Sequence, residues 1–398
     1  MYISPERIIA YFQPILSADS KTVYSYEILG RFIDDNGDVK SLGAIFNDPN
    51  TTNEEALRLD RIVRKYAMKK YAEEKRNESL FINIRLAWLM EYADNPEEML
   101  TLQWAKEFGI SPEKLVIEIT EEEFNADDTY VRSIVYYKSV GCRIALDDYG
   151  KSASNIDRLA KLKPDIIKIN MDYIHNSEKS YHYREYLRSI ADFAESVGIE
   201  VLYEGIETQR QLDICTTLKG RYYQGFLISL PQSSMRDAAI NTIALSVSIE
   251  NAYMVQKNKI FKTETMRNLL DTQIKDFLKK NLFDYEQTDY NTYLLRIFRE
   301  LSNSRLIYLC NKQGDQLGCN VGIKAAKIDP NNYEQSAIST KINWAWRGYF
   351  YDILKSVTLG QKSCLSAAYY DVTTKDRIRT YSYAITNDVF LFIDIDAE

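Results

Sequence analysis

The sequence predicts an α/β protein: a TIM-like (β/α) barrel, then a helical connector, then a smaller α+β domain. Over about residues 7–232, short runs rich in Val, Ile and Leu alternate with longer amphipathic segments, which is the pattern of a parallel sheet covered by helices. The pattern becomes helical after residue 232 and β-rich after about 305. The length of 398 residues agrees with two domains, because single domains seldom exceed about 250 residues.

The elements of the barrel follow one another in a regular order. Residues 11–32 read as two strands joined by a polar turn, and this hairpin gives the barrel a strand that we expect to be antiparallel. Further apolar runs predict strands at 80–84, 115–119, 143–146, 165–169, 199–203 and 222–228. The segments between them predict helices at 55–74, 98–108, 127–139, 154–162, 180–197 and 208–217.

The rest of the chain has other periodicities. Apolar residues at helical spacing, from Met266 to Leu278, predict an amphipathic connector that packs on a neighbouring element. Gly314-Asp315 and the polar run 373–376 read as turns between strands of an antiparallel sheet. We therefore expect a barrel domain at 1–240, a connector at 241–285 and a C-terminal domain at 286–398.

Composition narrows the classes of function. The net charge of −7 gives no overall attraction to nucleic acid, and no run of about 18 apolar residues predicts insertion into a membrane. The five cysteines form no C-x-x-C pair, which favours reduced thiols in the cytoplasm over disulfides or a zinc site. The two histidines, His175 and His182, lie in one polar stretch, so most histidine-based mechanisms are excluded.

Polar side chains gather at the ends of the predicted strands, where a parallel barrel places its functional groups. One buried acid at such a place is usually structural, as a helix cap or half of an ion pair. Several acids together are costly to bury unless a cation compensates them, and oxygen ligands favour Mg²⁺ or Mn²⁺. Two such ions would suit attack of water on a phosphodiester. The residues are Glu27, Asn83, Glu118, Asp147, Asp148, Lys168, Glu204 and Gln224.

These residues also lie in short motifs that resemble those of a known family. In order, the motifs are YFQPI, YEILGR, FINIR, LVIEIT, IALDDYG, DIIKIN, YEGIET and YYQGFLIS. Over about residues 7–232 the chain resembles the EAL-domain cyclic-di-GMP phosphodiesterases. The resemblance implies a barrel enzyme, expected to be a homodimer, that opens cyclic-di-GMP to linear pGpG with two Mg²⁺ or Mn²⁺ ions.

The resemblance also implies a role for each matching residue. Lys168 and Gln224 match positions that orient the attacking water, and Glu207 matches a glutamate that steadies the loop after the Asp pair. Gln13 and Arg31 match contacts to the dinucleotide, as do Asp148, Lys168 and Gln224. The planar guanidinium of Arg31 suits a phosphate, although an isolated arginine would read as half of a surface ion pair. The implied metal ligands are Glu27, Asn83, Glu118, Asp147, Asp148 and Glu204, of which Glu27 and Glu204 are also expected to be catalytic.

Three departures from the family pattern leave the activity open. Gly30 replaces a leucine, Asn170 replaces an aspartate, and residues 150–154, GKSAS, stand where the family has G-T-G-Y-S. The GKS triplet is no phosphate-binding P-loop, because Ala145 stands where that motif needs glycine. The alternative to an enzyme is a receptor that binds cyclic-di-GMP and barely cleaves it. A metabolic barrel enzyme is disfavoured by the ordered motifs.

The C-terminal part resembles PAS/Cache-like sensory domains, and the order of the two parts resembles YkuI-type proteins. The segments that carry this resemblance are 314–317, 343–350, 369–385 and 391–395. One interpretation is a pocket for an unidentified small ligand, and the other is an aromatic core with a structural arginine. The candidate pocket residues are Trp346, Arg347, Tyr349 and Asp371.

Overall fold

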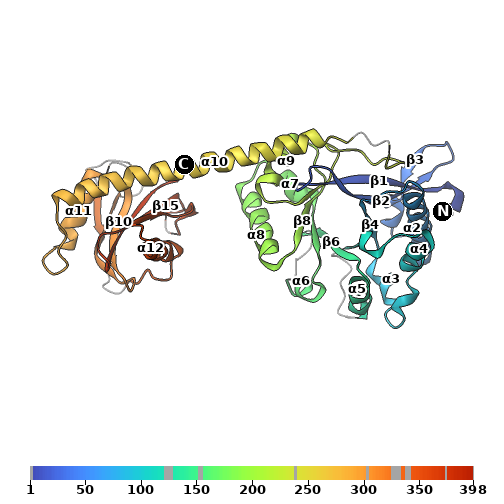
Figure 1. The fold of residues 1–398 in the computed structure, drawn as a ribbon, viewed down its shortest axis with the longest axis horizontal. Helices are drawn as coiled ribbons and strands as arrows, with labels where there is room; N and C mark the ends of the chain where they lie inside the picture. The colour runs from blue at the N-terminus through green and yellow to red at the C-terminus, as the bar shows by residue number, and fades with distance from the viewer. Residues whose placement is uncertain are drawn as a thin grey trace. The chain divides into compact units, whose positions relative to one another are not determined.

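The computed structural model describes residues 3–120, 129–150, 156–236, 240–301, 304–323, 333–336, 342–372 and 374–397. The chain divides into two compact units, Met1–Met254 and Val255–Glu398 (Figure 1). Among the helices in these described ranges, none combines the length and the apolar character that crossing a bilayer requires.

In the described part of the first unit, eight strands close into a barrel in the order β1-β9-β8-β7-β6-β5-β4-β2, and β1 pairs with β2 to complete the ring. Strand β1 is antiparallel to both neighbours, whereas β2 and β4 to β9 are parallel. The predicted TIM-like barrel with an antiparallel strand is therefore confirmed. The strands are β1 Ile8–Ser17, β2 Val23–Ile33, β4 Ser79–Asn83, β5 Leu115–Thr120, β6 Arg143–Tyr149, β7 Ile166–Ile169, β8 Glu200–Tyr203 and β9 Tyr222–Tyr223, with β3 Val39–Ser41 paired to β2 outside the ring.

The main helices lie within two residues of the predicted ends where those ends are described. They are α2 Asn53–Glu73, α4 Leu100–Phe108, α5 Thr129–Ser139, α6 Ile156–Leu162, α8 Tyr181–Val197 and α9 Gln209–Thr217. Short elements were not predicted: α1 Gly43–Phe46, α3 Leu86–Met90, α7 Met171–Ser177 and the 3₁₀ turns Pro5–Arg7, Pro96–Glu98 and Pro112–Lys114. The predicted strand 222–228 is wrong beyond Tyr223, because the backbone turns away at Gly225, which has a φ of 156°.

The interior of the barrel is built in layers. Residues two apart on a strand face the same side, so alternate positions point into the barrel and out toward the helices. The outward positions join the large core between strands and helices, whereas the inward positions form a separate buried cluster. That cluster contains Ile15, Phe81, Val116, Ala145, Ile166, Leu202 and Tyr222.

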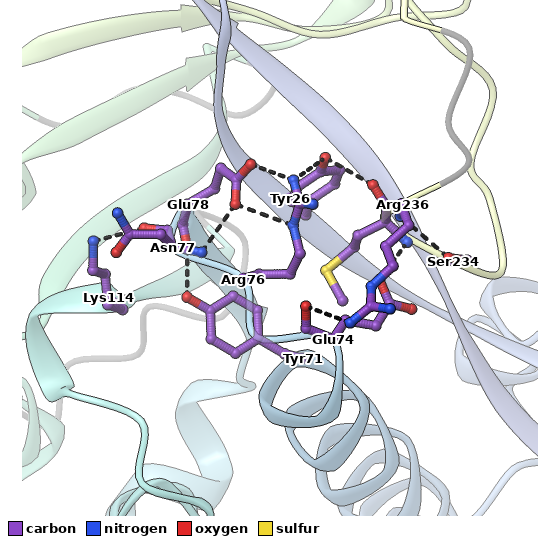
Figure 2. A network of polar contacts seen from close by, with 10 residues as sticks. Tyr26, Tyr71, Glu74, Arg76, Asn77, Glu78, Lys114, Ser234 and Arg236 are labelled. Carbon is purple, nitrogen blue, oxygen red and sulfur yellow. Dashed lines mark hydrogen bonds and ion pairs between the residues drawn. The ribbon is translucent and has the colours of Figure 1, made fainter.

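The chain leaves the barrel along a segment that is tied to strand β2. The Tyr26 hydroxyl donates to the carbonyl of Met235 across 3.1 Å, and the Met235 amide donates to Glu74 Oε2 across 3.1 Å. The Arg76 guanidinium donates to the same Tyr26 hydroxyl, and Arg236 donates to the Glu74 carbonyl (Figure 2). This network fixes the exit segment to the strand that also carries Glu27.

The second unit is an antiparallel sheet packed by helices, as predicted for an α+β domain. Its strand order is β12-β11-β10-β16-β15-β13, and β14 pairs with β15. Helix α10, Thr242–Lys280, continues from the first unit and buries Leu270, Ile274 and Phe277 in the core of the second. The other elements are α11 Tyr290–Glu300, β10 Ser304–Asn311, β11 Gln316–Ile323, β12 Tyr333–Ser336, α12 Gly348–Thr358, β13 Ser363–Leu365, β14 Tyr369–Tyr370, β15 Arg377–Ala384 and β16 Val389–Asp396.

Candidate active site

A polar layer lies directly above the apolar layer inside the barrel. On seven of the eight strands, the residue two positions beyond the inward-facing apolar residue, toward the carboxyl ends of the parallel strands, is polar; on β2 the residue below Glu27 is Ser25. Each of the eight strands contributes one polar residue to this layer, either from the strand itself or from the residue that directly follows it. Strand β1 is antiparallel to the others, so on this strand the polar residue comes before the apolar one in the sequence. The layer contains Gln13, Glu27, Asn83, Glu118, Asp147, Lys168, Glu204 and Gln224.

Lys168 is the centre of this layer. Its side chain is 1% exposed, and its Nζ donates a short hydrogen bond to Glu118 Oε1. The same nitrogen lies 3.2 Å from Asp147 Oδ1, 3.2 Å from Glu204 Oε2 and 3.6 Å from Glu27 Oε1. One ammonium group therefore faces four carboxylates, and the predicted convergence of these residues on one rim is present in the structure.

Amide side chains orient Glu27 from two sides. The Asn83 amide donates to Glu27 Oε1 across 3.2 Å, and the Gln224 amide donates to Glu27 Oε2 across 2.6 Å. The Gln224 amide also lies 3.3 Å from Gln13 Oε1, and Gln13 in turn donates to the carbonyl of Ser229. The orientation of the Glu27 carboxylate is thus fixed by neighbouring side chains of the protein itself.

A β-bulge brings two adjacent aspartates to the same side. Between Leu146 and Tyr149 strand β6 advances by one residue more than its partner β7, so the usual alternation of side chains is broken. Asp148 adopts a φ of 53°, a left-handed conformation that aspartate tolerates better than most residues. As a result, oxygen atoms of Asp147, Asp148 and Glu204 lie within 4.8 Å of one another.

The buried charges shift the acid–base behaviour of the site. Burial raises the pKa of Glu118 well above its usual range, although the Lys168 ammonium opposes the shift. Burial likewise raises the pKa of Glu204 to about 8, again against the effect of Lys168. For Lys168 itself burial lowers the pKa, but the surrounding carboxylates outweigh it and the net shift is upward. These directions agree with a cluster in which one ammonium group faces four carboxylates.

The residues present fit divalent metal ions. All candidate ligands offer oxygen atoms, which suit hard cations such as Mg²⁺, Mn²⁺ and Ca²⁺. Among the described residues, the buried atoms Glu118 Oε2 and Gln224 Oε1 have no hydrogen-bond partner. Buried acceptors and excess negative charge are both relieved by a cation. The residues that would hold it are Glu27, Asn83, Glu118, Asp147, Asp148 and Glu204, together with bound water.

Other residues assigned from the sequence lie around this layer. Arg31 is on the same face of β2 as Glu27, four residues further along, and packs over the ring of Tyr11 at 5.6 Å. Gly30 faces away from the polar layer, because an added Cβ would lie 3.0 Å from Leu42 Cδ1. Glu207 Oε2 lies 3.9 Å from His175 Nε2. Residues 151–154 of the atypical loop lie outside the described residues.

The C-terminal candidates form an aromatic cluster around Arg347. Its guanidinium lies 4.7 Å from the ring centre of Trp346, 5.9 Å from that of Tyr349 and 5.8 Å from that of Tyr369. Trp346 is 68% exposed, whereas Tyr349 is buried. The fourth candidate, Asp371, accepts a hydrogen bond from the amide of Thr374.

Two residues that support the Asp pair were missed by the sequence analysis. The Asn170 amide donates to Asp148 Oδ1, and the Tyr173 hydroxyl donates to the carbonyl of Gly150. The sequence shows Asn170 only as a departure from a motif, and nothing in the local sequence of Tyr173 indicates its contact. Both contacts arise because β7 lies beside β6 and α7 follows β7.

Comparison with known proteins agrees with this geometry. A family model described as EAL domain matches residues 3–231, and one described as EAL-domain associated signalling protein domain matches residues 242–398. The uncharacterized EAL-domain containing protein YkuI of Bacillus subtilis (strain 168) is 31% identical over 395 residues, which are 98% of this chain and 94% of YkuI. The probable cyclic di-GMP phosphodiesterase PdeA of Escherichia coli (strain K12) is 36% identical over 128 residues, 32% of this chain and 18% of PdeA.

Solved structures agree as well. The crystal structure of Bacillus subtilis YkuI in complex with substrate c-di-GMP and calcium matches with a TM-score of 0.89 and 28% identity, over 100% of each chain. The calcium and cyclic-di-GMP complex of Klebsiella pneumoniae BlrP1, at 24% identity, matches over 60% of each chain with a TM-score of 0.53, and so shares the barrel fold. The family match covers more than half of the sequence and the YkuI match nearly all of it, so this chain belongs to the EAL-domain family and joins an EAL domain to the C-terminal domain found in YkuI.

Proposed function

We propose that the protein is a metal-dependent phosphodiesterase that hydrolyses cyclic-di-GMP to linear pGpG. The observation that carries this proposal is the position of Lys168 among four carboxylates, beside the adjacent aspartates of the bulge. Such a cluster suits a phosphodiester, whose hydrolysis needs a negatively charged phosphate to be bound and an attacking water to be activated.

The residues of the chain divide these tasks. Bound Mg²⁺ or Mn²⁺ would lower the pKa of water and stabilise the charge that develops on the phosphate. The Lys168 ammonium lies between the carboxylates of Asp147 and Glu204 and would orient the attacking water. Gln224 and Asn83 keep Glu27 in one orientation. Gln13 and Arg31 lie on the two strands of the hairpin and would contact the dinucleotide, as the resemblance to the family implies.

The direct test is turnover of cyclic-di-GMP to pGpG, followed by chromatography with Mn²⁺ present or removed by chelation. Wild-type protein is expected to form pGpG only with metal. Glu27→Gln is expected to reduce turnover by about 100-fold, the upper end of the loss typical of a group that supports a metal ligand, because here a ligand and its charge are lost while the shape is kept. Glu286→Gln, an exposed residue of the second unit, is the matched control. Metal-independent turnover, or full activity of Glu27→Gln, would contradict the proposal.

The alternative is a receptor that binds cyclic-di-GMP without appreciable cleavage. The observation that favours it is that the related YkuI was crystallised with c-di-GMP and calcium together. Binding and product formation measured on one sample distinguish the two functions. Tight binding with Mn²⁺ present and no pGpG after long incubation would establish the receptor.

We also propose that the second unit binds a small ligand and adjusts the activity of the first. The support is Arg347, whose Nε is buried without a hydrogen-bond partner among the described residues while three aromatic rings surround the guanidinium. Arg347→Ala is expected to change the turnover of the full-length protein without changing metal affinity. The homodimer and the cytoplasmic location that the sequence predicts stay predictions.

A further inference from the structure

The bulge that presents the Asp pair contains a strained residue. Asp148 has a φ of 53°, and a residue other than glycine is strained in this conformation. Such a residue keeps its conformation only when the surrounding structure holds it there. The neighbours of Asp148 therefore decide where its carboxylate points.

Asn170 is one of these neighbours, and its side chain is fixed at both ends. It is 8% exposed and is the N-cap of helix α7, where its Oδ1 accepts a hydrogen bond from the amide of Asp172 across 2.8 Å. Since the oxygen is committed to the helix, the Nδ2 group must point the other way, and it donates to Asp148 Oδ1. The cap thus gives the amide a single orientation, and a carboxylate in this orientation could not donate.

Helix α7 also contacts Gly150, two residues after Asp148. The Tyr173 hydroxyl donates to the carbonyl of Gly150, and its ring lies so close that an added Cβ on Gly150 would be 3.1 Å from the ring. The ring is itself packed against Tyr186, with ring centres 5.3 Å apart. The N-cap of helix α7 therefore contacts Asp148 and the helix itself contacts Gly150, the residues on either side of Tyr149, the last residue of strand β6.

We propose that Asn170 is a positioning residue that sets the divalent-metal affinity of the site by orienting Asp148, with Tyr173 supporting the same segment. The inference rests on the proposed function, because it takes Asp148 as a metal ligand. Groups that hydrogen-bond to a metal ligand typically change metal affinity about 10- to 100-fold when they are removed. The neutral amide supplies this hydrogen bond without adding a further negative charge to the cluster.

Asn170→Ser separates positioning from folding. Serine is as good an N-cap as asparagine, so helix α7 keeps its cap, but the shorter hydroxyl does not reach Asp148. We expect the affinity for Mn²⁺, measured by electron paramagnetic resonance of the free ion, to fall at least tenfold, with the unfolding temperature unchanged. Tyr173→Phe, which keeps the ring packing, is expected to lower the affinity by a smaller factor. Thr52→Ser, a cap of α2, is the control and should change neither quantity.

The possible results distinguish a failure of this inference from a failure of the proposed function. Wild-type protein that binds Mn²⁺, together with Asn170→Ser that binds it equally well, would overturn the inference and leave the proposed function standing. A loss of affinity matched by a large fall in unfolding temperature would also overturn it, because the role would then be structural. Wild-type protein that binds neither Mn²⁺ nor cyclic-di-GMP would overturn the proposed function and the inference with it.

Discussion

The Gln224 side-chain amide donates to Glu27 Oε2 across 2.6 Å, and it joins the last strand of the barrel to the second. Both residues are buried, and the two strands are separated by β1, whose Gln13 contacts the same amide. The polar layer is therefore continuous across the place where the antiparallel strand enters the ring. Because of this continuity, Gln224, which follows the last strand of the barrel in the sequence, orients the carboxylate of Glu27 on the second strand.

Removing this donor should weaken catalysis without unfolding the barrel. Gln224→Met keeps the length of the side chain but loses the hydrogen bond to Glu27, so we expect turnover of cyclic-di-GMP to fall about 10- to 100-fold. Steady-state kinetics with Mn²⁺ present measure the change. Gln313→Met, at an exposed turn of the second unit, is the matched control, and equal rates for the two variants would refute this role of Gln224.

Replacing only one partner of the Lys168–Glu118 ion pair should lower the free energy of unfolding strongly. In Lys168→Met the buried Glu118 loses its cationic partner, which typically costs about 3–5 kcal/mol. The double variant Lys168→Met/Glu118→Gln removes the orphaned charge as well and should recover at least about 1 kcal/mol of this loss. Urea unfolding in the presence of a chelator measures the free energy of unfolding of each protein. A double variant less stable than the single one would contradict the expected coupling.

The barrel and its ring of polar residues were predictable because both depend on local patterns. Apolar runs of strand length mark the layers, and the motif residues follow them at fixed offsets. The support of Asp148 by Asn170 was not predictable, since it depends on a bulge in the pairing of β6 with β7 that no local pattern indicates. The sequence also left two interpretations of Arg347, and only the structure shows three rings around its guanidinium.

A buried carboxyl of the second unit should make its stability depend on pH. Burial raises the pKa of Asp394 to about 7, and the hydrogen bond from Thr380 opposes the shift. The unfolded value is about 3.9, so between pH 4 and pH 7 the folded state binds more protons than the unfolded state. The stability that this group contributes is therefore fully present below pH 4 and is lost as the pH rises toward 7. The loss is about 1.4 kcal/mol for each unit of pH between the unfolded and the folded pKa.

The variant Asp394→Asn should remove this dependence. It keeps the size of the side chain and an acceptor for Thr380 but cannot ionise, so its unfolding free energy should change less between pH 4 and pH 7 than that of the wild type. Urea unfolding of both proteins across this range measures the difference. Asp352→Asn, at an exposed position of helix α12, should keep the wild-type slope. Parallel curves for wild type and Asp394→Asn would contradict the assignment.

Gly225 should be intolerant of any side chain, because it holds Gln224 in place. Its φ is 156°, and an added Cβ would lie 2.1 Å from the carbonyl oxygen of Ile206 and 2.2 Å from its amide nitrogen. These are backbone atoms that cannot move aside, since Ile206 donates to the carbonyl of Gln224 across 3.0 Å. Gly225→Ala must therefore separate two hydrogen-bonded segments at the end of the polar layer.

We expect Gly225→Ala to lower the free energy of unfolding by more than about 3 kcal/mol and to abolish turnover. Gly348→Ala is the matched control, because Gly348 begins helix α12 and an added Cβ would meet no atom within 4 Å. Alanine has the higher helix propensity, so this variant should be as stable as the wild type or more stable by up to about 1 kcal/mol. If both alanine variants unfolded at the same urea concentration, the close approach of Gly225 to Ile206 would not be the constraint that ends strand β9 at Tyr223.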